Sequence, residues 1–367
     1  MSEKEHHESE MKSALTVNPG VEQQPVVNPE AVARIRRNRK KALSADEYAE
    51  AILKGDISTL SRAITLVESR LDEHFAVSQA VIERCLPHAG KSVRIGITGV
   101  PGAGKSTFIE AFGKHLTARG RKLAVLAVDP SSERSKGSIL GDKTRMAELA
   151  CDDRAFIRPS PSAGSLGGVA RKTRESVVLC EAAGFDTVLV ETVGVGQSET
   201  LVHSMVDFFL LLMIPGAGDE LQGIKRGIME MADMIVINKA DGSNIDRAMQ
   251  AMAQYRSAMH LFPAPRSGVT PKVLAVSSTE KTGLDEVRET IAEYVQTARS
   301  NGFFDANRRN QTKSGMYETI NAALQTRFYS DPKIRAMLPE YETKTAEGHI
   351  SPFIAASELL SEYFKAK

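Results

Sequence analysis

Residues 99–106 have the sequence Gly-Val-Pro-Gly-Ala-Gly-Lys-Ser, which is the spacing of a phosphate-binding loop. Glycines let such a loop curl so that its backbone N–H groups face the phosphates. Lys105 would supply a positive charge to the β- and γ-phosphates, and Ser106 a hydroxyl for Mg²⁺. The loop follows the apolar run 93–98 and precedes a helical pattern, which is the expected context. We predict that the nucleotide phosphates contact Val100, Gly102, Ala103, Gly104, Lys105, Ser106 and Thr107.

A second motif predicts which base is bound. Asn238-Lys239-Ala240-Asp241 follows the apolar run 234–237. A carboxylate such as Asp241 can accept hydrogen bonds from both N1–H and the exocyclic amine of guanine, and adenine offers no such pair of donors. We expect Asn238 to link this loop to the phosphate loop and Lys239 to lie along the base. Backbone N–H groups of the segment after the run 272–276 would meet the guanine carbonyl, and these residues are Ser277, Ser278 and Thr279.

Carboxylates at two further strand ends predict a magnesium site. Glu191 follows the apolar run 187–190, and Asp129 follows the run 123–128. Glu191 would hold Mg²⁺ directly or through water, and Asp129 would organise the metal's water shell or the attacking water. Gly194 would offer its N–H to the γ-phosphate. Asp142 is a further metal candidate, although a role as a helix N-cap is equally well supported. The predicted metal ligands are Ser106, Asp129, Asp142 and Glu191, and the predicted catalytic residues are Lys105, Asp129 and Glu191.

The segment 215–225 is longer and richer in glycine than a connection to a helix requires. We interpret it as a switch that responds to the nucleotide or contacts a partner. Its groups able to change contacts are Asp219, Gln222 and Lys225. An ordinary N-cap at Asp219 is the alternative.

Apolar runs alternate with helical patterns from residue 93 onward, which predicts an α/β fold of P-loop NTPase type. Its sheet would be mostly parallel with helices on both faces, and helical extensions would precede and follow it. The predicted strands are 93–98, 122–128, 187–191, 208–214, 234–237 and 272–276. The predicted helices are 104–119, 168–183, 220–231, 244–259, 283–298, 303–329, 332–338 and 352–365.

The same patterns divide the chain into four parts. We expect a disordered tail over 1–28, a helical segment over 29–90, a GTPase domain over 91–300 and a helical extension over 301–367. The extension is the expected place of dimerisation.

The composition restricts the class of partner. The 367 residues carry 47 basic and 46 acidic side chains, so no overall field favours nucleic acid or a membrane surface. The longest apolar run, 208–214, is too short to span a bilayer. Three cysteines without C-x-x-C spacing suit a reducing compartment, and the acidic first 28 residues are unlike a mitochondrial leader. We therefore expect a cytoplasmic protein.

Together these motifs resemble those of the methylmalonyl-CoA mutase-associated GTPases, called MeaB in bacteria and MMAA in animals and formerly labelled ArgK-type. The resemblance is carried by Glu191-x-x-Gly194, by Asp129-Pro-Ser-Ser and by the segments 55–68 and 215–223, and it covers roughly residues 45–330. It implies a homodimeric GTPase that binds an adenosylcobalamin-dependent acyl-CoA mutase, gates cofactor loading, and protects or reactivates the mutase.

The resemblance also implies roles for single residues. It makes Lys105 the phosphate-loop lysine, and Asn238 and Asp241 the guanine-reading residues. The metal and switch carboxylates would be Asp129, Asp142 and Glu191. Gln222 and Lys225 would couple mutase binding to hydrolysis.

Three other functions compete with this one. A nickel-insertion GTPase would explain Cys85 and His88, but a soft-metal site needs more converging ligands. An ATP-dependent kinase or partitioning ATPase is opposed by Asp241, and Val100 stands where a partitioning ATPase would place a second lysine. Cobalamin binding by this chain is opposed at Asp72-Glu73-His74, because the glycine of a D-x-H-x-x-G motif does not follow. We expect cobalamin to belong to the partner.

Overall fold

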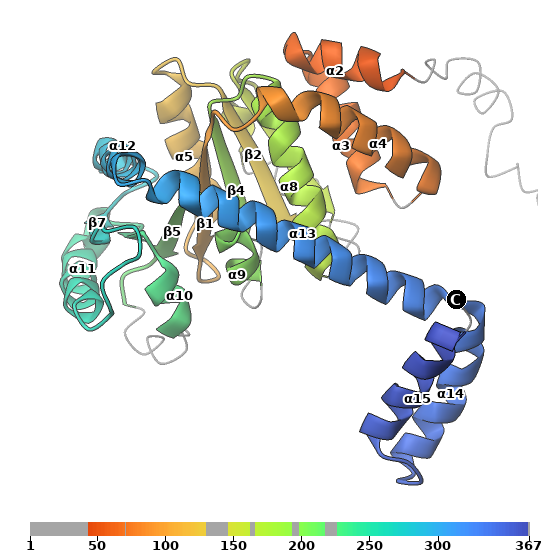
Figure 1. Cartoon of the computed structure of the whole chain (residues 1–367). Coiled ribbons are helices and arrows are strands. Elements are labelled where there is room, and N and C mark those ends of the chain that lie inside the picture. The colour runs from red at the N-terminus through yellow and green to blue at the C-terminus, as the bar shows by residue number, and fades with distance from the viewer. Residues whose placement is uncertain are drawn as a thin grey trace, which may run out of the picture. The chain divides into compact units, whose positions relative to one another are not determined.

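The computed structural model describes residues 43–69, 71–129, 146–161, 166–192, 198–216 and 226–365. Its centre is a seven-stranded parallel sheet in the order β3-β2-β4-β1-β5-β6-β7 (Figure 1). The strands are β1 (Val93–Gly99), β2 (Leu123–Asp129), β3 (Ala155–Pro161), β4 (Thr187–Thr192), β5 (Phe208–Met213), β6 (Met234–Ile237) and β7 (Lys272–Ala275). This arrangement confirms the predicted α/β class.

Helices cover both faces of the sheet because alternate side chains of each strand point to opposite faces. Leu210 and Leu212 of β5 pack with α5 (Lys105–Thr117) and α12 (Leu284–Ser300) in one core. Leu211 and Met213 belong to a second core with α10 (Arg226–Met231) and α11 (Ile245–Met259). Strands that are buried on both faces are apolar at every position, as β5 is.

Further helices lie beside β2 and β4 and around the sheet's edge. These are α7 (Ala147–Ala150), α8 (Leu166–Ala182) and α9 (Ser198–His203), together with the short 3₁₀ helix η3 (Gly242–Asn244). Gly96 of β1 allows α9 to pack closely, since an added Cβ would lie 2.9 Å from a Val202 methyl carbon.

The segment before the sheet is helical, with α2 (Ala45–Leu53), α3 (Ile57–Glu68), α4 (Asp72–Cys85) and the 3₁₀ helix η1 (Leu86–His88). Ser44 caps α2 in a capping box with Glu47, and the Asp56 carboxylate caps α3. Leu60 and Ile64 of α3 are fully buried. Apolar side chains at this spacing form one face of a helix.

Three helices follow the sheet, α13 (Phe303–Ser330), α14 (Pro332–Ala346) and α15 (Pro352–Lys365). Arg308 of α13 fixes the first of them to the sheet, because its guanidinium donates to both carboxylate oxygens of Asp207 at 2.8 and 2.7 Å. Asp207 is 4% exposed and also accepts from the Arg94 backbone N–H at 2.8 Å. Figure 1 shows α14 and α15 side by side beyond the end of α13.

Strand β3 and the short helices α7 and α9 are absent from the predicted elements, and one predicted helix ends too early. Strand β3 was missed because only Phe156 and Ile157 form an apolar pair before Pro159. An edge strand tolerates proline because one of its sides needs no hydrogen-bond donor. The helix predicted to end at residue 338 continues to Ala346 through Pro339, which is exposed at the surface, where water can satisfy the freed carbonyl.

The predicted domain boundaries at residues 28, 90 and 300 stay predictions. Within the described part of the chain, no helix is both long enough and apolar enough to cross a membrane.

Candidate functional site

The phosphate-binding loop connects β1 to α5, and its glycines stand where other residues would not fit. Gly102 and Gly104 have φ angles of 75° and 82°, in the left-handed region. A Cβ on Gly99 would lie 2.3 Å from the Leu212 carbonyl oxygen, and one on Gly104 would lie 2.9 Å from Nδ2 of Asn238. The loop therefore depends on glycine both for its curl and for its close contact with β5 and the Asn238 loop.

Lys105 begins α5 and its ammonium lies within the loop. The Nζ atom donates to the Gly99 carbonyl oxygen at 2.9 Å. Burial lowers the pKa of Lys105, and the carboxylates of Glu191 and Glu199 oppose this shift. A partly desolvated cation at the start of a helix is well placed to bind an anion, since the helix dipole adds to its charge.

Ser106 and Glu191 lie next to each other at the carboxyl ends of β1 and β4. The Ser106 hydroxyl is 3.4 Å from Oε1 of Glu191. Glu191 is 3% exposed and lies opposite Ile97 of β1 and Ala127 of β2 in the sheet register. A hydroxyl and a carboxylate are both hard oxygen donors, so this pair fits Mg²⁺.

The other predicted phosphate-side residues are described only in part. Asp129 is the last residue of β2, where its backbone pairs with Pro161, and its side chain is outside the described part of the structure. The remaining predictions fall on residues outside the described ranges, and these are Asp142, Gly194, Asp219, Gln222 and Lys225. Val100 is half-buried against the core, and Thr107 is exposed on α5.

Asn238 joins the phosphate loop to the segment after β7. Its Nδ2 donates to the Ala103 carbonyl oxygen at 2.8 Å, and its Oδ1 accepts from the Ser278 hydroxyl at 2.7 Å and from the Ser278 N–H at 3.3 Å. Asn238 is 2% exposed and Ser278 is 6% exposed. A single buried amide group thus holds three loops in one arrangement.

Asp241 lies beside the same segment with its carboxylate accessible to solvent. Its Oδ2 accepts from the Ser277 hydroxyl at 2.5 Å and from the Thr279 hydroxyl at 2.9 Å. These hydrogen bonds lower the pKa of Asp241, so the side chain is ionised near neutral pH. Lys239 is exposed and has a φ of 59°, a left-handed conformation that few residues other than glycine adopt. The Ser277 and Thr279 hydroxyls thus fix the position of the carboxylate. Its role as an acceptor for guanine stays a prediction.

One carboxylate close to the site is absent from the predicted residues. Glu199 in α9 is 1% exposed, and its charge favours the protonated form of Lys105. Glu199 is not part of a recognisable sequence motif. Only the packing of α9 beside β1 indicates its proximity, so no sequence signal would have identified it.

The alternative metal and cofactor motifs have structural roles in this fold. Cys85 is buried in α4, and burial raises the pKa of its thiol to about 11, which disfavours the thiolate that a soft metal needs. His74 makes a 2.8 Å hydrogen bond through Nδ1 to the Ser69 hydroxyl. Across the described residues, no group of three or more His, Cys, Asp or Glu side chains is placed to hold a metal.

Comparisons with known proteins agree on one family. A model of the family described as methylmalonyl Co-A mutase-associated GTPase MeaB matches residues 60–333. A putative GTPase of Caulobacter vibrioides is 49% identical over 322 residues, which cover 88% of this chain and 98% of the relative. The mouse protein named methylmalonic aciduria type A homolog, mitochondrial, is 46% identical over 338 residues, covering 89% and 81% of the two chains. A crystal structure described as LAO/AO transport system kinase is 37% identical with a TM-score of 0.70, covering 88% of this chain and 97% of its own.

Proposed function

Because this chain belongs to the MeaB family of methylmalonyl-CoA mutase-associated GTPases, we propose that it serves an adenosylcobalamin-dependent acyl-CoA mutase of that type. It would gate cofactor loading and protect or reactivate the mutase. The observation that carries the proposal is the family match over residues 60–333, which includes the phosphate loop, Glu191 and the Asn238–Asp241 segment.

In the proposed nucleotide complex, each end of GTP is held by a different loop. The Lys105 ammonium and the backbone N–H groups of residue 100 and residues 102–107 bind the phosphates. The Asp241 carboxylate accepts from N1–H and the exocyclic amine of guanine, while backbone N–H groups of residues 277–279 meet its carbonyl. Asn238 holds the phosphate loop and the segment after β7 in fixed positions relative to each other through its hydrogen bonds to Ala103 and Ser278.

The oxygen donors near the phosphates suit magnesium. Ser106 and Glu191 would hold the ion, with Asp129 and Asp142 as further proposed ligands. A bound Mg²⁺ ion neutralises negative charge that develops on the phosphates. The proposed role of Lys105 is to stabilise the same charge from the protein side, and that of Asp129 is to organise the attacking water.

No arginine of this chain is assigned to the transition state, so we expect slow hydrolysis by the chain alone. We propose that the mutase accelerates hydrolysis through the switch residues Asp219, Gln222 and Lys225. Where another GTPase receives an arginine from its partner, the acceleration is about 10³- to 10⁵-fold.

The test is GTP turnover by the purified chain with and without a saturating methylmalonyl-CoA mutase. The proposal expects a large rise in kcat, and an unchanged turnover would contradict it. The Lys105→Ala variant mixed with the same mutase is the control, since any phosphate it releases comes from contaminating enzymes.

A homodimer is the proposed assembly, formed through the helical extension. Met316, Ile320 and Leu324 lie four residues apart along α13 and are 52%, 45% and 55% exposed. An apolar stripe of this kind on a surface helix is typical of a protein interface. Sedimentation of the parent chain and of Ile320→Asp tests this, and a parent that sediments as a monomer at micromolar concentration would refute it.

Cytoplasmic location, and partners limited to proteins and small molecules, stay predictions for this chain.

A further inference from the structure

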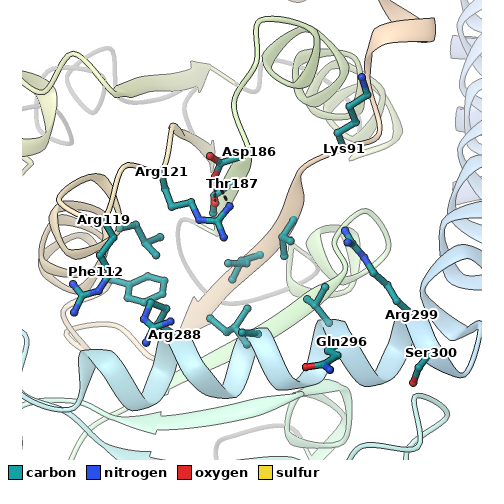
Figure 2. Close-up of a pocket in the computed structure, with 16 residues that line it drawn as sticks. Lys91, Phe112, Arg119, Arg121, Asp186, Thr187, Arg288, Gln296, Arg299 and Ser300 are labelled. Atoms are coloured by element: carbon teal, nitrogen blue, oxygen red, sulfur yellow. Dashed lines mark hydrogen bonds and ion pairs between the residues drawn. The ribbon is translucent and has the colours of Figure 1, made fainter.

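A pocket of about 930 Å³ (Figure 2) is lined by residues near the amino ends of β1 and β4. It is bounded by the first residues of β1 and β4, by the second half of α5 and by α12. Because parallel strands share one direction, the amino ends of β1 and β4 are distant from Gly99 and Glu191 at their carboxyl ends. The pocket is therefore separate from the proposed GTP site.

The floor of this pocket is apolar. It is formed by Val93, Ile95, Phe112, Leu116, Ile291 and Val295. All six belong to the core or pack against it, so the floor is rigid. A hollow of this volume with an apolar floor is typical of a small-molecule site.

Charged side chains surround the floor. On one side of the pocket, the arginines are paired with acidic side chains. Arg119 donates to Asp285 at 2.7 Å. Arg288 donates to Glu289 at 2.8 Å, and its Nε is 3.5 Å from Asp285. The charges of these two arginines are therefore largely compensated, so neither is the first choice for binding a ligand.

Arg121 lies on the same side as these two arginines and has an ion pair with Asp186 at 3.9 Å. The other side of the pocket carries uncompensated positive charge, because Lys91 and Arg299 form no ion pair with any of the described carboxylates. Arg299 stacks over the Phe304 ring at 4.8 Å, which leaves its guanidinium edge available for hydrogen bonding. Figure 2 shows Lys91 and Arg299 on one side of the pocket and Arg119, Arg121 and Arg288 on the other.

We propose that this pocket binds an organic monoanion with an apolar body, such as a medium-chain carboxylate. Arg299 holds the anionic group, and the hydrocarbon lies on the floor formed by β1, α5 and α12. A guanidinium favours a carboxylate because it can donate two parallel hydrogen bonds to it, and charged hydrogen bonds are stronger than neutral ones. The apolar floor excludes a fully hydrophilic anion, which would lose hydration there without a partner.

The test uses the full chain saturated with GDP, so that the nucleotide site is closed to the probe. Fluorescence of 1-anilinonaphthalene-8-sulfonate, an aromatic sulfonate that brightens in apolar surroundings, reports binding, and octanoate competes with it. We expect octanoate to displace the probe and inorganic phosphate to leave it bound. Displacement by phosphate alone would overturn the assigned ligand class.

Variants separate this pocket from other apolar surfaces that could bind the probe. The substitution Arg299→Gln should weaken octanoate binding about tenfold or more, as expected for losing charged hydrogen bonds. Ala292→Trp adds bulk at an exposed position that lines the pocket, so it should abolish octanoate competition while GTP turnover stays unchanged. Lys54→Gln, an exposed lysine outside the pocket, is the matched control and should bind as the parent does. Octanoate affinity within twofold of the parent in both pocket variants, or no octanoate binding by the parent, would refute the proposal.

Discussion

Removal of the Asn238 amide is the sharpest test of how the nucleotide site is organised. In Asn238→Ala the Ala103 carbonyl, the Ser278 N–H and the Ser278 hydroxyl lose their common partner. Leaving a buried polar group unsatisfied costs about 1–3 kcal/mol. Water can enter part of the space, so we expect a loss of about 3 kcal/mol in the free energy of unfolding of the nucleotide-free chain.

The same change should weaken GTP binding about tenfold to a hundredfold, because the loops must then be ordered by the ligand itself. Urea unfolding measures the stability, and calorimetry measures the affinity. Asn244→Ala is the matched control, since the Asn244 side chain makes no capping hydrogen bond at α11. An Asn238→Ala variant that unfolds and binds GTP like this control would refute the linking role.

Three further predictions address the base site, the C-terminal helices and a buried carboxyl group. Asp241→Asn should lower GTP affinity tenfold or more and improve xanthosine triphosphate binding relative to GTP, whereas unaltered GTP affinity in a fluorescent-nucleotide titration would count against the base assignment. Arg308→Leu leaves the buried Asp207 carboxylate uncompensated and should cost about 3–5 kcal/mol of unfolding free energy, measured by urea titration against Arg309→Leu. Burial raises the pKa of the Asp233 carboxyl group to about 7, so the folded state binds a proton at Asp233 more tightly than the unfolded state does. The free energy of unfolding gained in this way is lost as pH rises from about 4 through 7. Asp233→Asn should flatten that decline, and identical pH profiles in the two proteins would contradict the shifted pKa.

Local pattern was sufficient to predict most of the sheet. The run 208–214 predicts β5 because a strand buried on both faces must be apolar at every position. Its counterpart β3 has a polar second half, and its place at the sheet's edge depends on pairing with β2 rather than on its own residues. An edge strand of this kind can be recognised only when the position of the neighbouring strand is known.

The positions of the phosphate loop and of the Asn238–Asp241 loop were also predictable, since their residue types follow from local backbone requirements. Gly104 adopts a left-handed conformation, and Asn238 directly follows β6. Contacts between distant segments were not predictable in the same way. Arg308 and Asp207 are 101 residues apart in the chain, and nothing in either sequence neighbourhood indicates the other.

The pocket at the amino ends of β1 and β4 was not predictable for the same reason. Arg299 ends α12, whereas Val93 and Phe112 of the floor belong to β1 and α5, so these residues come together only in the folded chain. In the sequence Arg299 is an ordinary surface cation. Its significance comes from the apolar floor beside it and from the carboxylates that neutralise the other arginines of the pocket.

The proposed activity requires that the carboxyl edge of this sheet select guanine through Asp241 and bind the phosphates through the loop at Lys105. Calorimetric titration of the nucleotide-free chain with GTP and with ATP, both in the presence of magnesium, is the decisive experiment. We predict saturable binding of one GTP per chain and ATP binding at least about a hundredfold weaker. Equal affinity for the two nucleotides, or no heat with GTP, would contradict the assignment of this site.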